Sequence, residues 1–385
     1  MTDAIRPFRI AVPDAVLHDL RARLRNTRWP DAELVDDWSQ GAPLRWIQDV
    51  CRHWAEGYDW RAREAALNRF EQFVTELDGL DVHFIHARSP HAHAMPLLIT
   101  HGWPGSVVEF HKVIEPLTDP TAHRGAASDA FHMVCPALPG YGFSGKPTEA
   151  GWSVERIARA WSVLMQRLGY SRFVAQGGDW GSMVTTAIGL QDREGCAGIH
   201  LTMPIVAPDP ATMNDLTPAE KSALAGLKRY RAEGSGYARQ QGTRPQTLGY
   251  ALADSPAGQA AWVVEKYRAW MDCDGHPENV LTRDELLDQV MLYWLPNAAA
   301  SSARLYWESF ARPNREPVDA PTGISLFPKE IFRSSRRWAE QRFRNIVHWR
   351  EFDRGGHFAA LECPDVLVDE IRSCFRPLRA GVAAA

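Results

Sequence analysis

Midway along the chain the sequence reads Phe173-Val174-Ala175-Gln176-Gly177-Gly178-Asp179-Trp180-Gly181. The first four of these residues are typical of a short buried strand, and apolar residues recur with helical spacing from 183 to 188. Glycines on both sides of Asp179 allow the backbone to turn sharply between the two elements. The segment therefore predicts a strand, a tight turn and a helix, with an Asp side chain at the bend.

Asp179 has two interpretations. The spacing Gly177-x-Asp179-x-Gly181 matches the nucleophile elbow of α/β-hydrolases, except that Asp stands where those enzymes usually carry Ser. The sequence holds no competing Gly-x-Ser-x-Gly or Gly-x-Cys-x-Gly segment. Alternatively, Asp179 caps the helix that follows it, because Asp is a favoured N-cap residue.

The sequence around this bend alternates between strands and helices. Residues 97–99 and 131–135 are typical of buried strands, and a helix begins after Ser153 and ends at Gly169. Strand-like runs return at 322–327 and 346–349. This alternation predicts an α/β fold, with a mostly parallel sheet flanked by helices on both faces.

The remaining segments are mainly helical. Helical spacing begins at Pro13, and Asp78-Gly79 between two alternating runs predicts a hairpin. Residues 205–315 lack strand signals and contain the capping box that opens at Thr282. We therefore expect four parts, which are an N-terminal helical extension leading into the first strands (1–92), the first part of the core (93–204), a helical cap (205–315) and the second part of the core (316–385).

Composition excludes several classes of protein. Lys and Arg number 43 against 47 Asp and Glu among 385 residues, a net charge of −4 that argues against nucleic-acid binding. No apolar run approaches the roughly 20 residues of a membrane span, and the first residues do not resemble a signal peptide. The six cysteines form no C-x-x-C pair, so we expect reduced thiols and a cytoplasmic location. His91 and His93 lack a third ligand at metal-site spacing, so we expect no metal and no other cofactor. A homodimer is compatible with the sequence.

Two further motifs follow predicted strands, where open α/β sheets place their sites. They are His101-Gly102-Trp103-Pro104-Gly105 and Arg354-Gly355-Gly356-His357-Phe358. In a hydrolase of this kind, the backbone N–H groups of Trp103 and Trp180 would form an oxyanion hole, and His357 would be the base. Taken singly, the first motif is equally compatible with a plain Pro-Gly turn. His357 taken singly is equally compatible with a loop histidine whose hydrogen bonds are only structural.

Together these segments resemble the epoxide hydrolases of the α/β-hydrolase fold, in particular the microsomal and juvenile-hormone type. The likeness covers nearly the whole chain, including the motifs above, Asp254-Ser255-Pro256-Ala257-Gly258 and Met291-Leu292-Tyr293-Trp294. The resemblance implies epoxide and water as substrates, with Asp179 as nucleophile and His357 as base. It also implies Glu330 as the acid, because Glu330 follows Phe327-Pro328; Asp353, nearer His357 in sequence, is the alternative. The proton donors implied for the epoxide oxygen are Tyr237, in a Ser-Gly-Tyr context, and Tyr306, in a Ser-Ser-x-x-x-Tyr context.

The chemistry of epoxide hydrolysis requires the same residue types. A Ser that attacked an epoxide carbon would form a stable ether, whereas the carboxylate of Asp179 forms an ester that an activated water can hydrolyse. Two other functions remain as alternatives. A haloalkane dehalogenase shares the Asp nucleophile but usually carries Asn where this chain has Trp103. A catalytically inactive α/β-hydrolase would only bind a ligand. The 15 Trp residues suggest a bulky apolar or aromatic epoxide, and roles in detoxification or in secondary metabolism both fit.

Overall fold

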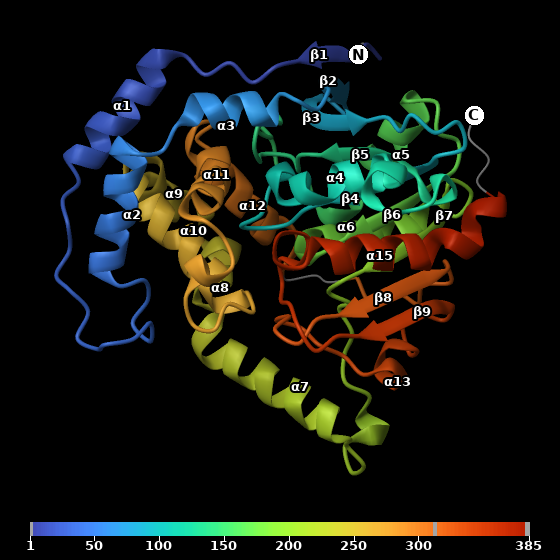
Figure 1. The fold of residues 1–385 in the computed structure, drawn as a ribbon. Coiled ribbons are helices and arrows are strands. Elements are labelled where there is room, and N and C mark those ends of the chain that lie inside the picture. The colour runs from blue at the N-terminus through green and yellow to red at the C-terminus, as the bar shows by residue number, and fades with distance from the viewer. Residues whose placement is uncertain (1–2, 311–313, 382–385) are drawn as a thin grey trace.

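A single nine-stranded sheet forms the centre of the computed structural model, which describes residues 3–310 and 314–381 (Figure 1). Its strand order is β1-β2-β3-β5-β4-β6-β7-β8-β9. The strands are β1 (Arg6–Phe8), β2 (Gln72–Leu77), β3 (Leu80–Ala87), β4 (Met95–Thr100), β5 (Phe131–Pro136), β6 (Phe173–Gly177), β7 (Cys196–Leu201), β8 (Thr322–Leu326) and β9 (Ile346–Glu351). From β5 to β9 all neighbours are parallel, and β1 to β3 add an antiparallel edge.

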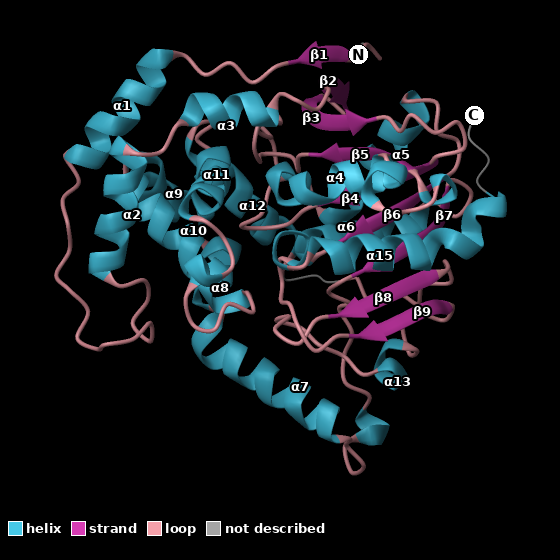
Figure 2. Cartoon of the chain, viewed as in Figure 1, coloured by secondary structure: helices cyan, strands magenta, loops and turns pink. Residues whose placement is uncertain are grey.

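Helices cover both faces of the sheet (Figure 2). Helices α4 (His111–Thr118) and α15 (Pro364–Phe375) pack on one face, and α5 (Val154–Arg167) and α6 (Asp179–Gln191) pack on the other. Side chains of β4 alternate between these layers: Leu97 belongs to the first core and Leu98 to the second. The mostly parallel sheet flanked by helices, predicted from the sequence, is confirmed.

The N-terminal part contains helices α1 (Asp14–Arg25), α2 (Leu44–Glu56) and α3 (Trp60–Leu67). It also contributes strand β1, which pairs antiparallel with β2 and which the sequence did not indicate, since three residues are too few for a periodic pattern. The hairpin between β2 and β3 turns at Asp78 and Gly79, whose φ angles are +50° and +80°. Two consecutive positive φ angles are what an Asp-Gly turn of type I′ requires.

A helical region lies between β7 and β8 and covers the carboxyl end of the sheet. Its helices are α7 (Pro218–Arg229), a π-helical turn (Tyr230–Gly234), α8 (Gly236–Thr243), α9 (Pro245–Asp254), α10 (Pro256–Trp270), α11 (Arg283–Trp294) and α12 (Ala299–Ser309). The predicted capping box is present, because Thr282 and Glu285 each accept a hydrogen bond from the other's backbone N–H. Residues 311–313, at the end of the expected cap, lie outside the described residues, as do 1–2 and 382–385. Among the described helices, none combines the length and apolar character needed to span a bilayer.

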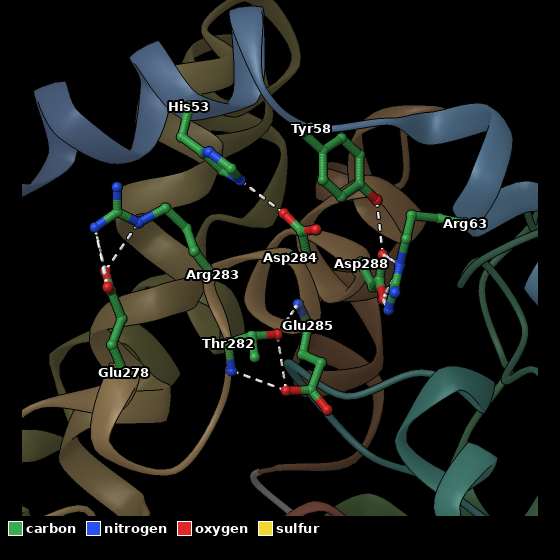
Figure 3. A network of polar contacts seen from close by, with 9 residues as sticks. All are labelled: His53, Tyr58, Arg63, Glu278, Thr282, Arg283, Asp284, Glu285 and Asp288. Atoms are coloured by element: carbon green, nitrogen blue, oxygen red, sulfur yellow. Dashed lines mark hydrogen bonds and ion pairs between the residues drawn. The ribbon is translucent and has the colours of Figure 1, made fainter.

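Helix α11 of this region is held by the N-terminal helices (Figure 3). The carboxylate of Asp288 is only 3% exposed and accepts hydrogen bonds from the Tyr58 hydroxyl (2.7 Å) and the Arg63 guanidinium (2.9 Å). One turn earlier, Asp284 lies 2.7 Å from Nε2 of His53. A buried carboxylate is stable only when it is paired in this way, so these contacts fix the extension against the cap.

Candidate active site

Asp179 stands at the bend between β6 and α6, in a conformation that non-glycine residues rarely adopt. Its φ is +49°, and Gly178 before it is the N-cap of the helix. The bend is so tight that a Cβ on Gly181 would lie 1.9 Å from the carbonyl oxygen of Thr100, which explains the glycine there. The alternative that Asp179 caps the helix is therefore wrong, because the helix begins one residue earlier than that interpretation requires and its cap position belongs to glycine.

The carboxylate of Asp179 lies against backbone N–H groups from two loops. Its Oδ1 accepts a hydrogen bond of 2.8 Å from the Trp103 N–H, and the Trp180 N–H also bonds to the carboxylate. Gly102 leaves room for this approach, since a Cβ there would lie 2.1 Å from Oδ1. Burial raises the pKa of Asp179, and the His357 ring and the two N–H groups oppose that rise. The second oxygen, Oδ2, is left to face the rest of the site.

His357 and Glu330 complete a row of three side chains. Nε2 of His357 lies 3.5 Å from Oδ2 of Asp179, and Nδ1 lies 2.8 Å from Oε1 of Glu330. The Glu330 side chain is fully buried, whereas Asp353, the alternative acid, is exposed. Burial by itself lowers the pKa of His357, but Glu330, Asp179 and Glu109 together outweigh it and raise the pKa to about 9. Of the two candidate acids, the one in contact with His357 is Glu330.

Both predicted tyrosines lie over Trp103 and Trp180, the tryptophans of the predicted oxyanion hole. Tyr237 stacks on Trp103 with ring centroids 5.0 Å apart, and Tyr306 meets the edge of Trp180 at 4.7 Å. The two tyrosine rings are 5.8 Å apart, and both side chains are buried. Burial and the nearby Asp179 charge raise the pKa of each phenol well above its usual value. Both hydroxyls therefore stay protonated at neutral pH.

Three residues that the sequence did not mark also belong to the site. The Trp270 ring lies 5.0 Å from the His357 ring, and the Lys266 ammonium lies 4.8 Å from the centre of the Tyr237 ring. The side chain of Glu109 folds over Gly105, and burial raises its pKa to about 8. The spacing of Lys266 and Trp270 places them on one face of α10, but many buried helix residues share that spacing, so the sequence offers no specific signal.

The loop that carries His357 is fastened to the end of α10. The His357 N–H donates to the Trp270 carbonyl (3.0 Å), and the Gly355 N–H donates to Oδ2 of Asp272 (3.0 Å). Glu362 accepts from the Asp272 N–H (2.7 Å) through one oxygen and from the Phe358 N–H (2.8 Å) through the other. These four hydrogen bonds, here called the clasp, tie the His357 loop to the cap.

Within the described residues, no group of three or more His, Cys, Asp or Glu side chains has the arrangement of a metal site. Instead, Nε2 of His91 lies 3.2 Å from a carboxylate oxygen of Asp119. The six cysteines are buried and free.

Comparison with known proteins identifies the family. Residues 5–110 match the family described as epoxide hydrolase N terminus, and residues 95–242 match the alpha/beta hydrolase fold. A protein of Stigmatella aurantiaca, assigned provisionally as an epoxide hydrolase, is 56% identical over 377 residues, which is 98% of this chain and 86% of the relative. Epoxide hydrolase 1 of Sus scrofa is 34% identical over 96% of this chain and 88% of its own length.

The chain belongs to the epoxide hydrolase family. The crystal structure of juvenile hormone epoxide hydrolase from the silkworm Bombyx mori superposes with a TM-score of 0.91 at 28% identity, over 98% of this chain and 95% of that one. The predicted family and fold are thus confirmed, and membership favours an epoxide hydrolase over the dehalogenase and the inactive binding protein. An epoxide hydrolase has an epoxide and water as its substrates.

Proposed function

We propose that this epoxide hydrolase forms a covalent ester between Asp179 and a carbon of the epoxide, and that water activated by His357 and Glu330 then releases a vicinal diol. One observation carries the proposal: the carboxylate of Asp179 has one oxygen on the backbone N–H of Trp103 and the other 3.5 Å from Nε2 of His357. This division gives the two oxygens different tasks. Oδ2 attacks carbon, and Oδ1 becomes the carbonyl oxygen of the ester.

The ring-opening step needs an acid. As the carbon–oxygen bond of the epoxide breaks, the oxygen becomes an alkoxide, which leaves readily only if a proton is in place. Tyr237 and Tyr306 are neutral phenols at neutral pH, because burial and the Asp179 charge raise the pKa of each. Both rings lie directly over the tryptophans that flank Asp179. A donor at this place protonates the oxygen while Asp179 attacks.

The second step uses the same geometry. A water beside His357 gives its proton to Nε2 and adds to the carbonyl carbon of the ester. The oxyanion that forms on Oδ1 is held by the Trp103 and Trp180 N–H groups, and such a donor is typically worth about 100- to 1,000-fold in rate. Glu330 keeps the proton on Nδ1, so that Nε2 is free to act as the base.

The surroundings of the two tyrosines support a bulky apolar or aromatic epoxide as the substrate. Trp103, Trp180 and Trp270 all lie within ring contact of Tyr237 or Tyr306. Aromatic walls favour apolar and aromatic groups through buried area and ring contacts. The buried, free cysteines support a reducing compartment, and we place the enzyme in the cytoplasm.

The experiment that tests this proposal stops the reaction half-way. In a His357→Gln variant Asp179 can still attack, but no base activates the water. After mixing with styrene oxide, the intact mass of this variant should rise by one substrate mass, and a variant that also carries Asp179→Asn should show no rise. A His357→Gln protein that stays unmodified while it turns over at the parent rate would overturn the proposal.

A further inference from the structure

The hydroxyl of Tyr237 contacts a second tyrosine hydroxyl, that of Tyr230, which has no role in the proposed mechanism. Oη of Tyr230 lies 3.1 Å from Oη of Tyr237, within hydrogen-bond distance. Tyr230 begins the π-helical turn that joins α7 to α8 in the cap (Figure 1). Such turns are rare in proteins and occur frequently at functional sites. The turn brings a third tyrosine to the predicted proton donors.

The two hydrogen-bonded tyrosines differ in their surroundings. Tyr237 is 5% exposed and is enclosed by the rings of Trp103 and Trp270. Tyr230 is partly exposed, and its ring packs edge-on against Phe332 at 5.1 Å. The pair therefore joins a hydroxyl inside the site to one on a side chain that reaches the protein surface.

We propose that Tyr230 restores to Tyr237 the proton that Tyr237 gives to the epoxide oxygen. This inference rests on the proposed function, in which Tyr237 is a donor. As the carbon–oxygen bond breaks, the Tyr237 proton moves to the oxygen and the Tyr230 proton moves to Tyr237. Tyr230, left as a phenolate, then takes a proton from water. Because Tyr230 acts through Tyr237, it is a positioning residue and not a catalytic one.

The numbers of protons taken up and released are equal over the whole reaction cycle. In the second step His357 takes a proton from the attacking water and returns it to the diol oxygen that leaves the ester. The carboxylic acid formed on Asp179 then gives up its proton. That proton replaces the one that His357 releases to solvent when the ester forms, because the pKa of the resting His357 is raised to about 9. One proton thus enters through Tyr230 and one leaves from His357, so each turnover adds one water to one epoxide.

The charges around the pair favour this direction of transfer. A phenolate on Tyr237 would be buried and would face the negative Asp179, and the cation near its ring, Lys266, is already paired with Glu265. On Tyr230 the same charge lies on a side chain that is partly exposed. The pKa of Tyr230 is raised to about 12 by burial, whereas that of Tyr237 lies well above its usual value. Moving the charge outward therefore lowers its energy.

The test measures ester and proton together in the His357→Gln background. Styrene oxide is added, the ester is followed by intact mass, and proton uptake is followed with a pH indicator in weak buffer. We expect one proton taken up per ester, at the rate at which ester forms. Tyr230→Phe should slow ester formation about tenfold, the order expected for one net hydrogen bond, and proton uptake should lag behind the ester.

Three further variants separate a relay from a structural effect. Tyr250→Phe removes a hydroxyl from a cap tyrosine that is 72% exposed, and it should change neither rate. In a Tyr237→Phe background, Tyr230→Phe should have no further effect. A ring-fluorinated tyrosine at 230, which keeps the side-chain shape but ionises more readily, should move the alkaline limb of the ester-formation profile to lower pH.

The outcomes are distinct. Unchanged rates in Tyr230→Phe, equal slowing with and without Tyr237, or an unmoved pH profile would each overturn the relay while leaving the ester mechanism intact. If the His357→Gln protein forms no ester although the parent makes diol, both the relay and the proposed function fail.

Discussion

At the scale of single residues, the charge on His357 decides when the base can act. In the resting enzyme the pKa of His357 is raised to about 9, with Glu330, Asp179 and Glu109 as the charges that outweigh burial. In the proposed mechanism, formation of the ester removes the negative charge of Asp179. One of the interactions that stabilise the protonated ring is then lost, so the pKa of His357 falls. A lower pKa leaves more of the proposed base neutral once there is an ester to hydrolyse.

This change of charge gives a prediction on pH. Only neutral His357 can accept a proton, so the rate of ester hydrolysis should rise with pH and level off above an apparent pKa lower than 9. The measurement is a single turnover with styrene oxide, quenched at several pH values, with the ester followed by intact mass. An apparent pKa at or above that of the resting enzyme would contradict the argument.

The choice of acid is a second prediction at this scale. Glu330 is buried against Nδ1 of His357, whereas Asp353 is exposed. Glu330→Gln removes the charge that supports the imidazolium and should slow ester hydrolysis about 100-fold or more, the size typical of general-base catalysis. The matched variant Asp353→Asn should hydrolyse at the parental rate. Equal slowing by both variants would mean that the carboxylate beside His357 has no special role.

At the scale of elements, local sequence signals predicted local structure well. The Asp-Gly hairpin, the capping box at Thr282 and the strand–turn–helix around Asp179 each depend on a few adjacent residues, and each is present. Strand β1 was missed because its three residues gain their conformation from pairing with β2. The contact between Glu330 and His357 joins loops after two different strands, so the residues alone left Asp353 open. The resemblance to a family favoured Glu330, which follows β8, the parallel neighbour of the strand β9 that precedes His357.

The sequence could not predict the clasp either, because Asp272 and Glu362 are 90 residues apart. It provides a prediction for helix α14 (Ala359–Glu362), which begins two residues after His357. Glu362 accepts two backbone N–H groups, and burial raises its pKa to about 7. Gln at this position has one oxygen, so one N–H loses its acceptor, at a cost of about 1–3 kcal/mol.

Glu362→Gln should therefore disturb the position of His357 and slow ester hydrolysis about tenfold, whereas ester formation, which needs only Asp179 and the tyrosines, should keep its rate. The two rates are measured separately in single turnovers. Asp365→Asn, which breaks an exposed ion pair with Arg354 in the same region, serves as the control. A loss confined to ester formation would show that the clasp does not act through His357.

At the scale of the whole molecule, the extension and the cap stabilise each other through the buried carboxylate of Asp288. Arg63→Met would leave that carboxylate without its cation while Tyr58 still donates to it. The loss should lower the free energy of unfolding by about 3 kcal/mol, the lower end for a broken buried pair because Arg63 itself is one-third exposed. Urea denaturation of the parent and the variant measures this difference in the free energy of unfolding.

Arg52→Met is the matched control for this prediction. Arg52 pairs with Asp49 on the surface of α2, and both side chains are well exposed. Its removal should cost less than about 1 kcal/mol. If the two variants lose the same small amount of stability, the extension does not depend on Asp288 for its place against the cap.

The central claim is that Asp179 attacks carbon and is regenerated by water. In that case the oxygen of the diol comes first from the Asp179 side chain, and an oxygen from solvent takes its place in the carboxylate. The most direct measurement is turnover in heavy-oxygen water, followed by mass analysis of the peptide that contains Gln176 to Met183. We expect this peptide to gain heavy oxygen at Asp179 only after turnover, with no gain in an Asp179→Asn protein. Heavy oxygen in the diol from the first turnover, with an unlabelled peptide, would contradict the account.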